Sequence, residues 1–341
     1  MQRRIRALVV EEDAAPRQAL AALLAADRAI RPTTAADPLA AARQLERDPP
    51  DVILLDAAPQ RVEGLAVLKR ALARRTLPVV LCLGASRPAL LPAILPALLL
   101  ALAEGEVAEV LVKPSATASP DDQEDIRDRV RAAAESGLPR PPPLPLPAPA
   151  APLRRPAVVC LGAATGGPAA LLRLLPALPP ACPPLVVALP LPPPLAGALA
   201  ALLAARCRIA VREAREGDLP CPGAALLAPP GRHLLLGPGL RVTLQEAPPL
   251  QGRRPSVDLL FRSAAHHAGA AAMGVLLSGR GEDGAQGLLA LREAGAACLV
   301  QDEACCRHAG MPRAALALGA ATHSLPLAGL AAAMLGGGNG G

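Results

Sequence analysis

Aromatic residues are almost absent from this chain of 341 residues, which contains one Phe and no Trp or Tyr. Proteins that bind single-stranded nucleic acids stack the bases on aromatic side chains, and cages for cationic ligands need several aromatic rings. The composition therefore argues against both kinds of site. A length of 341 residues instead predicts two domains, each large enough to bury a hydrophobic core.

Lysine and asparagine are nearly as scarce, since the chain has Lys only at Lys69 and Lys113 and Asn only at Asn339. Its 35 Lys and Arg residues outnumber 29 Asp and Glu residues, and Arg supplies almost all of the formal net charge of +6. Because Ala, Pro, Gly and Arg are abundant together, we attribute the basic balance to a GC-rich coding sequence. We expect no nucleic-acid partner.

Long apolar runs are also missing. The longest, Ala89–Ala103, is shorter than the roughly 20 residues of a transmembrane helix and contains Pro92 and Pro96. The N-terminus reaches Glu11 and Glu12 after one short apolar run, which is not the pattern of a secretory signal. We therefore expect a cytoplasmic protein without membrane insertion. The eight cysteines form no CxxC pair, so we assign them neither disulfides nor zinc.

Proline is concentrated in Leu138–Pro156, a segment that predicts a semi-rigid linker between two domains. We place the first domain at residues 1–137, the linker at 138–156, the second domain at 157–335 and a Gly-rich tail at 336–341. In both domains short apolar runs alternate with longer stretches that are compatible with helices, which is typical of α/β domains with a parallel sheet. The predicted strands are Ile5–Val10, Val52–Leu55, Leu77–Leu83, Glu109–Val112, Ala157–Leu161, Leu185–Leu189, Ala224–Leu227 and Met273–Leu277.

Charged residues follow three of the strands predicted in the first domain. Glu11 and Glu12 come directly after the first run, Asp56 follows the second, and Lys113 follows the last. Sites in open parallel sheets form beyond the carboxyl ends of strands. Carboxylates there would hold Mg²⁺, and the lysine could neutralise a transferred phosphoryl group. Taken singly, each acid could instead be a helix cap or a solvated loop residue.

The segments IRALVVEEDAAPRQAL, PDVILLDAAPQRVEGLAVL, PVVLCLGAS and EVLVKP make the first domain similar to response-regulator receiver domains, which have a flavodoxin-like fold. The resemblance implies that Asp56 is the phosphoacceptor, that Glu11, Glu12 and Asp56 hold Mg²⁺, and that Lys113 contacts the phosphate. Two features depart from the receiver pattern: the acidic pair is Glu-Glu rather than Asp-containing, and Leu83 replaces the usual Ser or Thr. The prolines of 88–103 should also break the helix expected there.

Small residues fill the strand-to-helix turn GAATGG at Gly162–Gly167, where backbone amides and a helix N-terminus could face an anion or an oxyanion. Farther along come APPGRHLLL, RRPSVDLLF, GVLLSGRGEDGAQGL and QDEACCRHAGMPRAAL. Together these motifs resemble the chemotaxis protein-glutamate methylesterase family. The resemblance implies a doubly wound α/β domain that hydrolyses glutamyl methyl esters on chemoreceptors, with glutamine deamidation in some members. It also implies control by a chemotaxis histidine kinase through the receiver.

That family uses a Ser, a His and an Asp, and the resemblance places these roles at Ala164, Pro190 and Asp283. Ala cannot attack a carbonyl, and Pro has no side chain that moves a proton, so the family mechanism is not expected to operate. Without a His partner, Asp283 is expected to cap the helix that begins near Gly284. The sequence also departs from the family at Arg253, where His is common, and at Arg280, where Met is common.

Thr165 stands next to the vacated nucleophile position, but neighbouring residues of a tight turn point in different directions. The histidines of the chain lie outside the segment where a base is needed. We expect His233 to be a turn residue bonded to the backbone and His266 and His267 to lie on a polar helix face. The five histidines are His233, His266, His267, His308 and His323.

Three hypotheses for function remain open at this stage. The chain is a receptor methylesterase with atypical catalytic residues, a phosphorylatable pseudoenzyme that binds receptors or the kinase, or the product of a decaying gene. The replacements at Ala164 and Pro190 favour the second.

Overall fold

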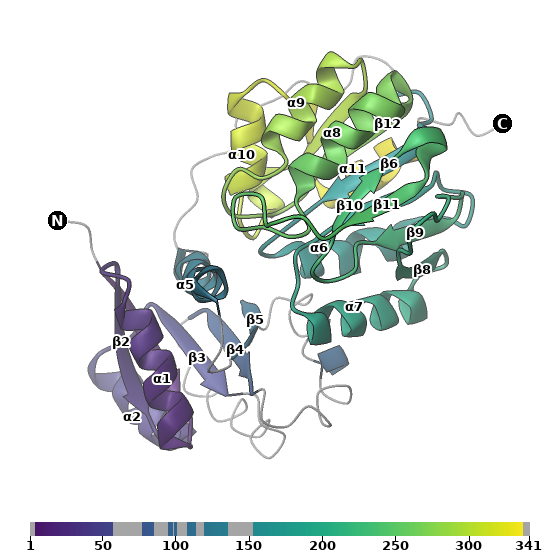
Figure 1. Ribbon diagram of the computed structural model, residues 1–341. Helices are drawn as coiled ribbons and strands as arrows, with labels where there is room; N and C mark the ends of the chain where they lie inside the picture. Colours follow the sequence, from purple (N-terminus) through teal and green to yellow (C-terminus); the bar gives the residue numbers. More distant parts are fainter. Residues whose placement is uncertain are drawn as a thin grey trace. The chain divides into compact units, whose positions relative to one another are not determined.

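The computed structural model describes residues 4–56, 77–84, 95–97, 99–100, 108–113, 119–135 and 153–336 (Figure 1). The chain divides into two units, Met1–Pro139 and Arg140–Gly341. Most of the predicted linker and tail lies outside the described residues, and so does most of the run 88–103. Positions 95–97 and 99–100 of that run are described and are helical.

The first unit is built on a five-stranded parallel sheet with the order β2-β1-β3-β4-β5, the flavodoxin-like order. Its central strands are apolar apart from Arg6 near the start of β1 and Asp56 at the end of β3, as expected for a sheet buried on both faces. The four strands predicted in this domain are confirmed, and the sequence reading missed only β2. The strands are β1 Ile5–Val10, β2 Ile30–Ala35, β3 Val52–Asp56, β4 Val79–Leu83 and β5 Glu109–Val112.

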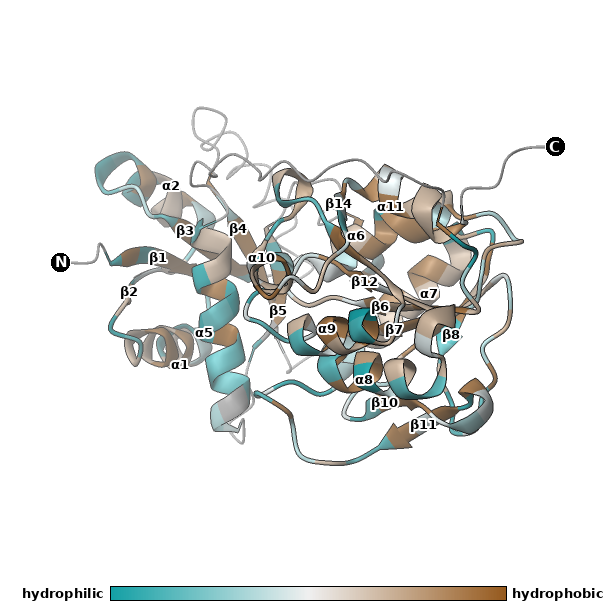
Figure 2. Ribbon diagram, turned by 90° about the horizontal axis from the view of Figure 1, so that it is seen from above, coloured by the Kyte–Doolittle hydropathy of each residue, from teal (hydrophilic) through white to brown (hydrophobic). Residues whose placement is uncertain are grey.

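The described helices of the first unit are α1 Ala14–Ala25, α2 Pro38–Arg47 and α5 Pro120–Glu135. Helix α2 begins after Asp37, whose side chain accepts a hydrogen bond of 2.7 Å from the Ala40 amide, the usual N-cap arrangement. Helix α5 is mostly hydrophilic in Figure 2, yet Ile126 and Val130 bury against the sheet core. An amphipathic helix of this kind covers a sheet face while its charges stay near water.

The second unit contains a seven-stranded sheet with the order β14-β13-β12-β6-β7-β9-β8, and every pair of neighbouring strands is parallel. The predicted strands are confirmed to within one residue at each end. An antiparallel hairpin, β10 with β11, stands apart from this sheet. The strands are β6 Val158–Gly162, β7 Leu185–Ala188, β8 Ala210–Glu213, β9 Ala224–Leu227, β10 His233–Leu236, β11 Val242–Gln245, β12 Ala272–Leu276, β13 Ala297–Gln301 and β14 His323–Leu325.

Helices cover both faces of this sheet, as Figures 1 and 2 show, so the second unit is a doubly wound α/β fold. Helices α8, α9 and α10 pack together, and α6 and α11 contact each other on the opposite face. The α-helices are α6 Gly167–Leu174, α7 Pro193–Arg206, α8 Val257–His267, α9 Ala285–Glu293, α10 Gly310–Ala317 and α11 Leu327–Met334. Short 3-10 turns occur at Leu175–Ala177, Pro238–Leu240, Gly269–Ala271 and Glu303–Cys305.

Strand order fixes where sites can form in this unit. The chain enters the sheet at β6, and the later strands are added on both sides of it: β7 next to β6 in one direction, β12 in the other. The order therefore reverses at β6, and the loops after β6, β7 and β12 meet at the carboxyl edge of the sheet. Within the residues described above, no helix is both long and apolar enough to cross a membrane.

Candidate functional sites

Three of the charged residues singled out in the first domain meet at the carboxyl edge of its sheet. The Lys113 ammonium lies 2.6 Å from Asp56 Oδ1 and also bonds Glu11 Oε2. All three side chains are largely buried. Burial disfavours the charge of Lys113, but the hydrogen bonds and negative charges of Asp56 and Glu11 outweigh it and raise the pKa of the ammonium. The lysine is therefore held charged beside the predicted phosphoacceptor.

Glu12 is exposed and lies outside this buried group. The loop that carries it is fastened by Arg17, whose Nη1 donates to the carbonyl oxygens of Glu11 at 2.7 Å and of Glu12 at 2.8 Å. Glu11 Oε1 accepts a further bond of 3.1 Å from the Asp13 amide. This role of Arg17 was not predicted from the sequence, because a guanidinium that binds backbone carbonyls requires no particular residues as partners and so produces no sequence motif.

The described residues contain no group of three or more His, Cys, Asp or Glu side chains arranged to hold a metal. Glu11 and Asp56 offer carboxylate oxygens, the donors that Mg²⁺ prefers, but both are directed at the Lys113 ammonium. The carboxylates are thus neutralised by a cation of the chain itself. A Mg²⁺ site at Glu11, Glu12 and Asp56 stays a prediction of the sequence.

In the second unit the turn after β6 is held between two other loops. The Ala163 amide donates to the Ala188 carbonyl at 3.1 Å, and the Ala164 amide donates to the Ser278 carbonyl at 3.0 Å. These bonds place the turn beside the loop after β7, which carries Pro190, and beside the loop after β12. Ala164 is buried, and its methyl group is the whole of its side chain.

Gly166 gives this turn its shape. Its φ is +81°, a value that favours glycine, and a Cβ at this position would lie 2.7 Å from both Ser278 Oγ and the Cβ of Arg307. Helix α6 starts at the next residue. The turn therefore brings the loops after β6, β12 and β13 into close contact.

Ser278, which the sequence reading did not single out, joins those three loops. Its hydroxyl lies 3.0 Å from the Thr165 carbonyl and 3.2 Å from the His308 carbonyl, and it accepts a 3.0 Å bond from the His308 amide. The residue is 1% exposed. A hydroxyl that is buried and bonded to backbone in this way acts as a structural link between loops, not as a free nucleophile.

Asp283 has a different role from the one expected of it as a cap. Helix α9 begins after Gly284, and its Gly287 amide donates to Asp258 Oδ1 at 2.7 Å rather than to Asp283, so the expected capping of that helix by Asp283 is wrong. Asp283 Oδ1 accepts bonds of 2.9 Å from Ser256 Oγ and 3.0 Å from the Asp258 amide, and Oδ2 accepts one of 2.9 Å from the Val257 amide. These donors form the first turn of α8, which is 25–27 residues away in sequence. Asp283 therefore caps α8 across a tertiary contact.

His233 is fully buried at the start of β10 rather than in a turn, but it is bonded to the backbone as predicted. Its Nδ1 accepts from the Ser256 amide at 3.1 Å, so Nε2 carries the proton and donates to the Pro248 carbonyl at 3.1 Å. Both ring nitrogens are thus engaged away from Ala164. His266 and His267 are exposed in the last turn of α8, which confirms the prediction for them.

His308 and His323 also make contacts that hold the fold together. The backbone of His308 bonds Ser278 and Gly279, and His323 Nδ1 lies 3.0 Å from Thr322 Oγ1. The structure therefore brings the three positions to which the resemblance assigns the triad onto neighbouring loops at one sheet edge. It places a methyl group at the first, a proline ring at the second and a helix-capping carboxylate at the third.

Comparison with known proteins agrees with this arrangement. Residues 159–334 match the family model of the CheB methylesterase. The chain belongs to the CheB methylesterase family. It is 42% identical over 347 residues to a protein-glutamate methylesterase/protein-glutamine glutaminase of Anaeromyxobacter dehalogenans, covering 95% of this chain and 94% of that protein.

Two further relatives extend the comparison. A protein-glutamate methylesterase/protein-glutamine glutaminase of Rhodospirillum rubrum is 37% identical over 369 residues, covering 99% of this chain and all of the relative. The crystal structure of the Thermotoga maritima CheB methylesterase catalytic domain matches 53% of this chain and 97% of its own, with a TM-score of 0.51 and 29% identity. Similarity to CheB methylesterases thus spans both units, and similarity to a solved structure covers the catalytic domain.

Proposed function

We propose that this chain is a receptor-associated response regulator of the CheB methylesterase family that does not hydrolyse methyl esters by the Ser, His and Asp mechanism. The observation that carries the proposal is the side chain at the centre of the site. Ala164 is buried on the β6–α6 turn, and its methyl group has no atom that can attack a carbonyl. The chemoreceptor partners are inferred from the activity in the names of the relatives.

A substitute triad has little support in the surroundings of Ala164. The Ser278 hydroxyl is occupied by backbone groups of Thr165 and His308. The His233 ring is occupied by backbone groups on both sides. An activated hydroxyl needs a base within hydrogen-bond reach, and these two side chains do not provide such a pair.

The decisive experiment compares release of labelled methanol from methylated receptor membranes by the natural protein and by an Ala164→Ser, Pro190→His double variant. We expect release at background level from the natural protein and release well above it from the double variant. Ala164→Ser alone is the matched control, because it restores the nucleophile without a base. Methanol release by the natural protein that far exceeds the background would contradict the proposal.

Receptor association is tested separately by sedimentation of the natural protein with receptor membranes, with and without acetyl phosphate. Binding in at least one of the two states is expected. If the natural protein binds neither the receptor membranes nor the chemotaxis histidine kinase in either state, the proposed role in receptor signalling is wrong. Undetectable expression of the gene in cells would favour a decaying gene product.

The proposal includes phosphorylation of Asp56. An Asp56 carboxylate oxygen would attack the phosphorus of acetyl phosphate and expel acetate, and the Lys113 ammonium, now 2.6 Å from Asp56, would balance charge on the transferred group. Mg²⁺ bound by the acidic residues would supply further charge neutralisation. With acetyl phosphate that carries a radioactive phosphoryl group, we expect the protein to acquire label that is stable in acid and lost in base. This labelling should disappear in Asp56→Asn and after addition of EDTA. Equal labelling of Asp56→Asn would exclude this site.

A further inference from the structure

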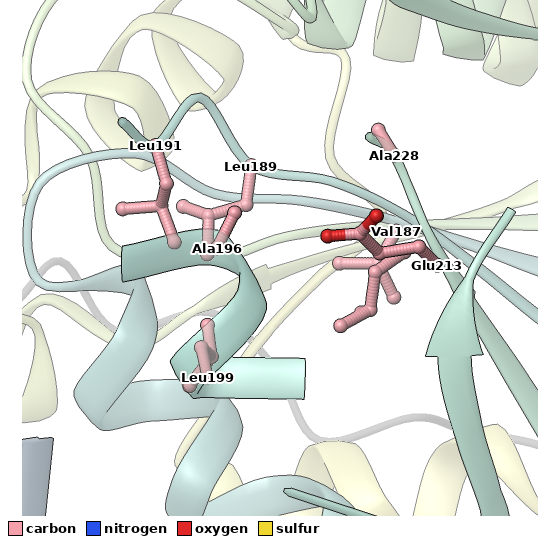
Figure 3. A pocket seen from close by; sticks show the side chains of 8 residues that line it. Val187, Leu189, Leu191, Ala196, Leu199, Glu213 and Ala228 are labelled. Carbon is pink, nitrogen blue, oxygen red and sulfur yellow. The ribbon is translucent and has the colours of Figure 1, made fainter. Parts of the chain in front are cut away.

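The second unit contains a small pocket at the carboxyl edge of its sheet (Figure 3). One wall consists of Val187 on β7 with Leu189 and Leu191 from the loop that follows. The first turns of α7 contribute Ala196 and Leu199. The ends of β8 and β9 close the other side. The lining is therefore aliphatic, and it flanks Pro190 on both sides in sequence.

Glu213 is the exception in this lining. It is the last residue of β8, and Figure 3 shows its carboxylate among the apolar side chains of the pocket. The neighbouring Arg212 bonds elsewhere, to the Glu213 carbonyl at 3.1 Å and to Asp218 Oδ2 at 2.5 Å. Among the residues that the structure describes, none pairs with the Glu213 side chain. A half-buried carboxylate in apolar surroundings lacks some of its hydration, so a cation at this position would be stabilised.

We propose that this pocket receives one aliphatic side chain that ends in a positive charge, as arginine or lysine does, from a peptide bound at the carboxyl edge of the sheet. The enclosed space is small: the centre of a water molecule can occupy only about 20 Å³ of it, far less than in small-molecule sites, so the pocket could admit no more than one side chain. The leucines would pack against the aliphatic stem, and Glu213 would form a charge-assisted hydrogen bond with the head.

The pocket lies next to the loop that carries Pro190 and close to the turn that carries Ala164. The loop after β7 lines the pocket, and its Ala188 carbonyl accepts the bond from Ala163 in the β6–α6 turn. A peptide anchored here would therefore be held next to Ala164 and Pro190. The inference rests on the proposed function only in taking the bound peptide to be part of a receptor. The chemistry of the pocket itself can be tested without one.

The test titrates the full-length protein with n-butylguanidinium and with its neutral isostere n-butylurea, and detects the ligands by saturation-transfer NMR. We expect the guanidinium to bind roughly 5- to 20-fold more tightly than the urea. Glu213→Gln should remove this preference. Glu216→Gln is the matched control, because Glu216 carries a charge three residues away and accepts a bond from the Leu244 amide, which an amide oxygen can also accept.

Filling the pocket provides a second test. Ala196 is half-buried on α7, and Ala196→Leu adds apolar volume while keeping a good helix former. Both ligands should then lose binding, whereas circular dichroism spectra should stay unchanged. Equal binding of the two ligands by the natural protein would overturn the inference. An undiminished preference for the guanidinium in Glu213→Gln would overturn it as well.

Receptor sedimentation with Glu213→Gln separates this inference from the proposed function. Failure of the natural protein to bind receptor membranes, together with a guanidinium preference that depends on Glu213, would remove the receptor role and leave the cationic pocket standing. Receptor binding without any guanidinium preference would remove the pocket and leave the receptor role. Receptor binding that weakens in Glu213→Gln but not in Glu216→Gln supports both.

Discussion

Replacement of Asp283 by alanine gives the sharpest test of its role as the cap of α8. The change removes the acceptor of three hydrogen bonds, from Ser256 Oγ and from the amides of Val257 and Asp258. The site is buried, since Asp283 is 6% exposed, so water does not easily replace the lost acceptor. A buried donor left without a partner costs about 1–3 kcal/mol. We therefore expect a loss of about 3–5 kcal/mol in the free energy of unfolding of the second unit.

A loss of that size corresponds to a fall of about 6–20 °C in Tm, because about 1 kcal/mol shifts the midpoint by about 2–4 °C in a domain of this size. The chain has no Trp or Tyr, so unfolding is followed by far-ultraviolet circular dichroism instead of fluorescence. Hydrogen exchange of Val257–His267 should also accelerate, since the Val257 and Asp258 amides in the first turn of α8 lose their acceptor.

Glu282→Ala is the matched control, because Glu282 is the exposed acidic neighbour of Asp283 in the same loop. We expect its Tm to stay close to that of the natural protein. If Asp283 mattered only as a partner of a catalytic His, its loss from a chain without that His would leave stability unchanged. An Asp283→Ala variant that melts within about 1 °C of the natural protein would therefore refute the capping argument.

Three further outcomes are expected. Burial raises the pKa of Asp258, so the folded protein binds this proton more tightly than the unfolded chain, and stability falls as pH rises through that pKa. The Tm of Asp258→Asn minus that of the natural protein should therefore be larger at pH 8 than at pH 4. The same Tm difference at both pH values would contradict this. Burial also raises the pKa of Cys160 to about 12, whereas Cys221 is exposed, so a thiol reagent at pH 8 should modify Cys221 first, as peptide mass spectrometry would show. Gly223 and Gly217 have similar positive φ values, but only Gly223 has a backbone carbonyl in the way of a Cβ, so Gly223→Ala should lower Tm more than Gly217→Ala.

Most interior strands were predictable because a strand buried on both faces tends to be a continuous apolar run. Val52–Asp56 and Ala224–Leu227 illustrate this, and they lie within one residue of the predicted bounds. Among the strands that were not predicted, β2 and β8 lie at sheet edges and carry exposed side chains, whereas β13, Ala297–Gln301, is a buried interior strand that the sequence analysis missed. Edge strands such as β2 and β8 need no apolar run, so their sequences are hard to distinguish from those of loops.

The receiver pocket was predictable for a similar reason. Parallel strands all end at the same edge, so residues at the ends of β1, β3 and β5 had to be neighbours. Glu11, Asp56 and Lys113 do meet there. The exposure of Glu12 could not be predicted, because it depends on the direction in which the loop after β1 turns and on the bonds of Arg17 to that loop.

By itself the sequence determined the α/β class of both units and the family, and it predicted the replacement of two triad residues, because periodicity, motifs and residue identity are local properties of the chain. Only the tertiary structure decided which helix Asp283 caps, which loops Ser278 joins, and that Glu213 lies in an aliphatic pocket. These contacts join residues far apart along the chain. Their partners are set by how the loops and helices pack on the sheet, which no short segment of sequence encodes.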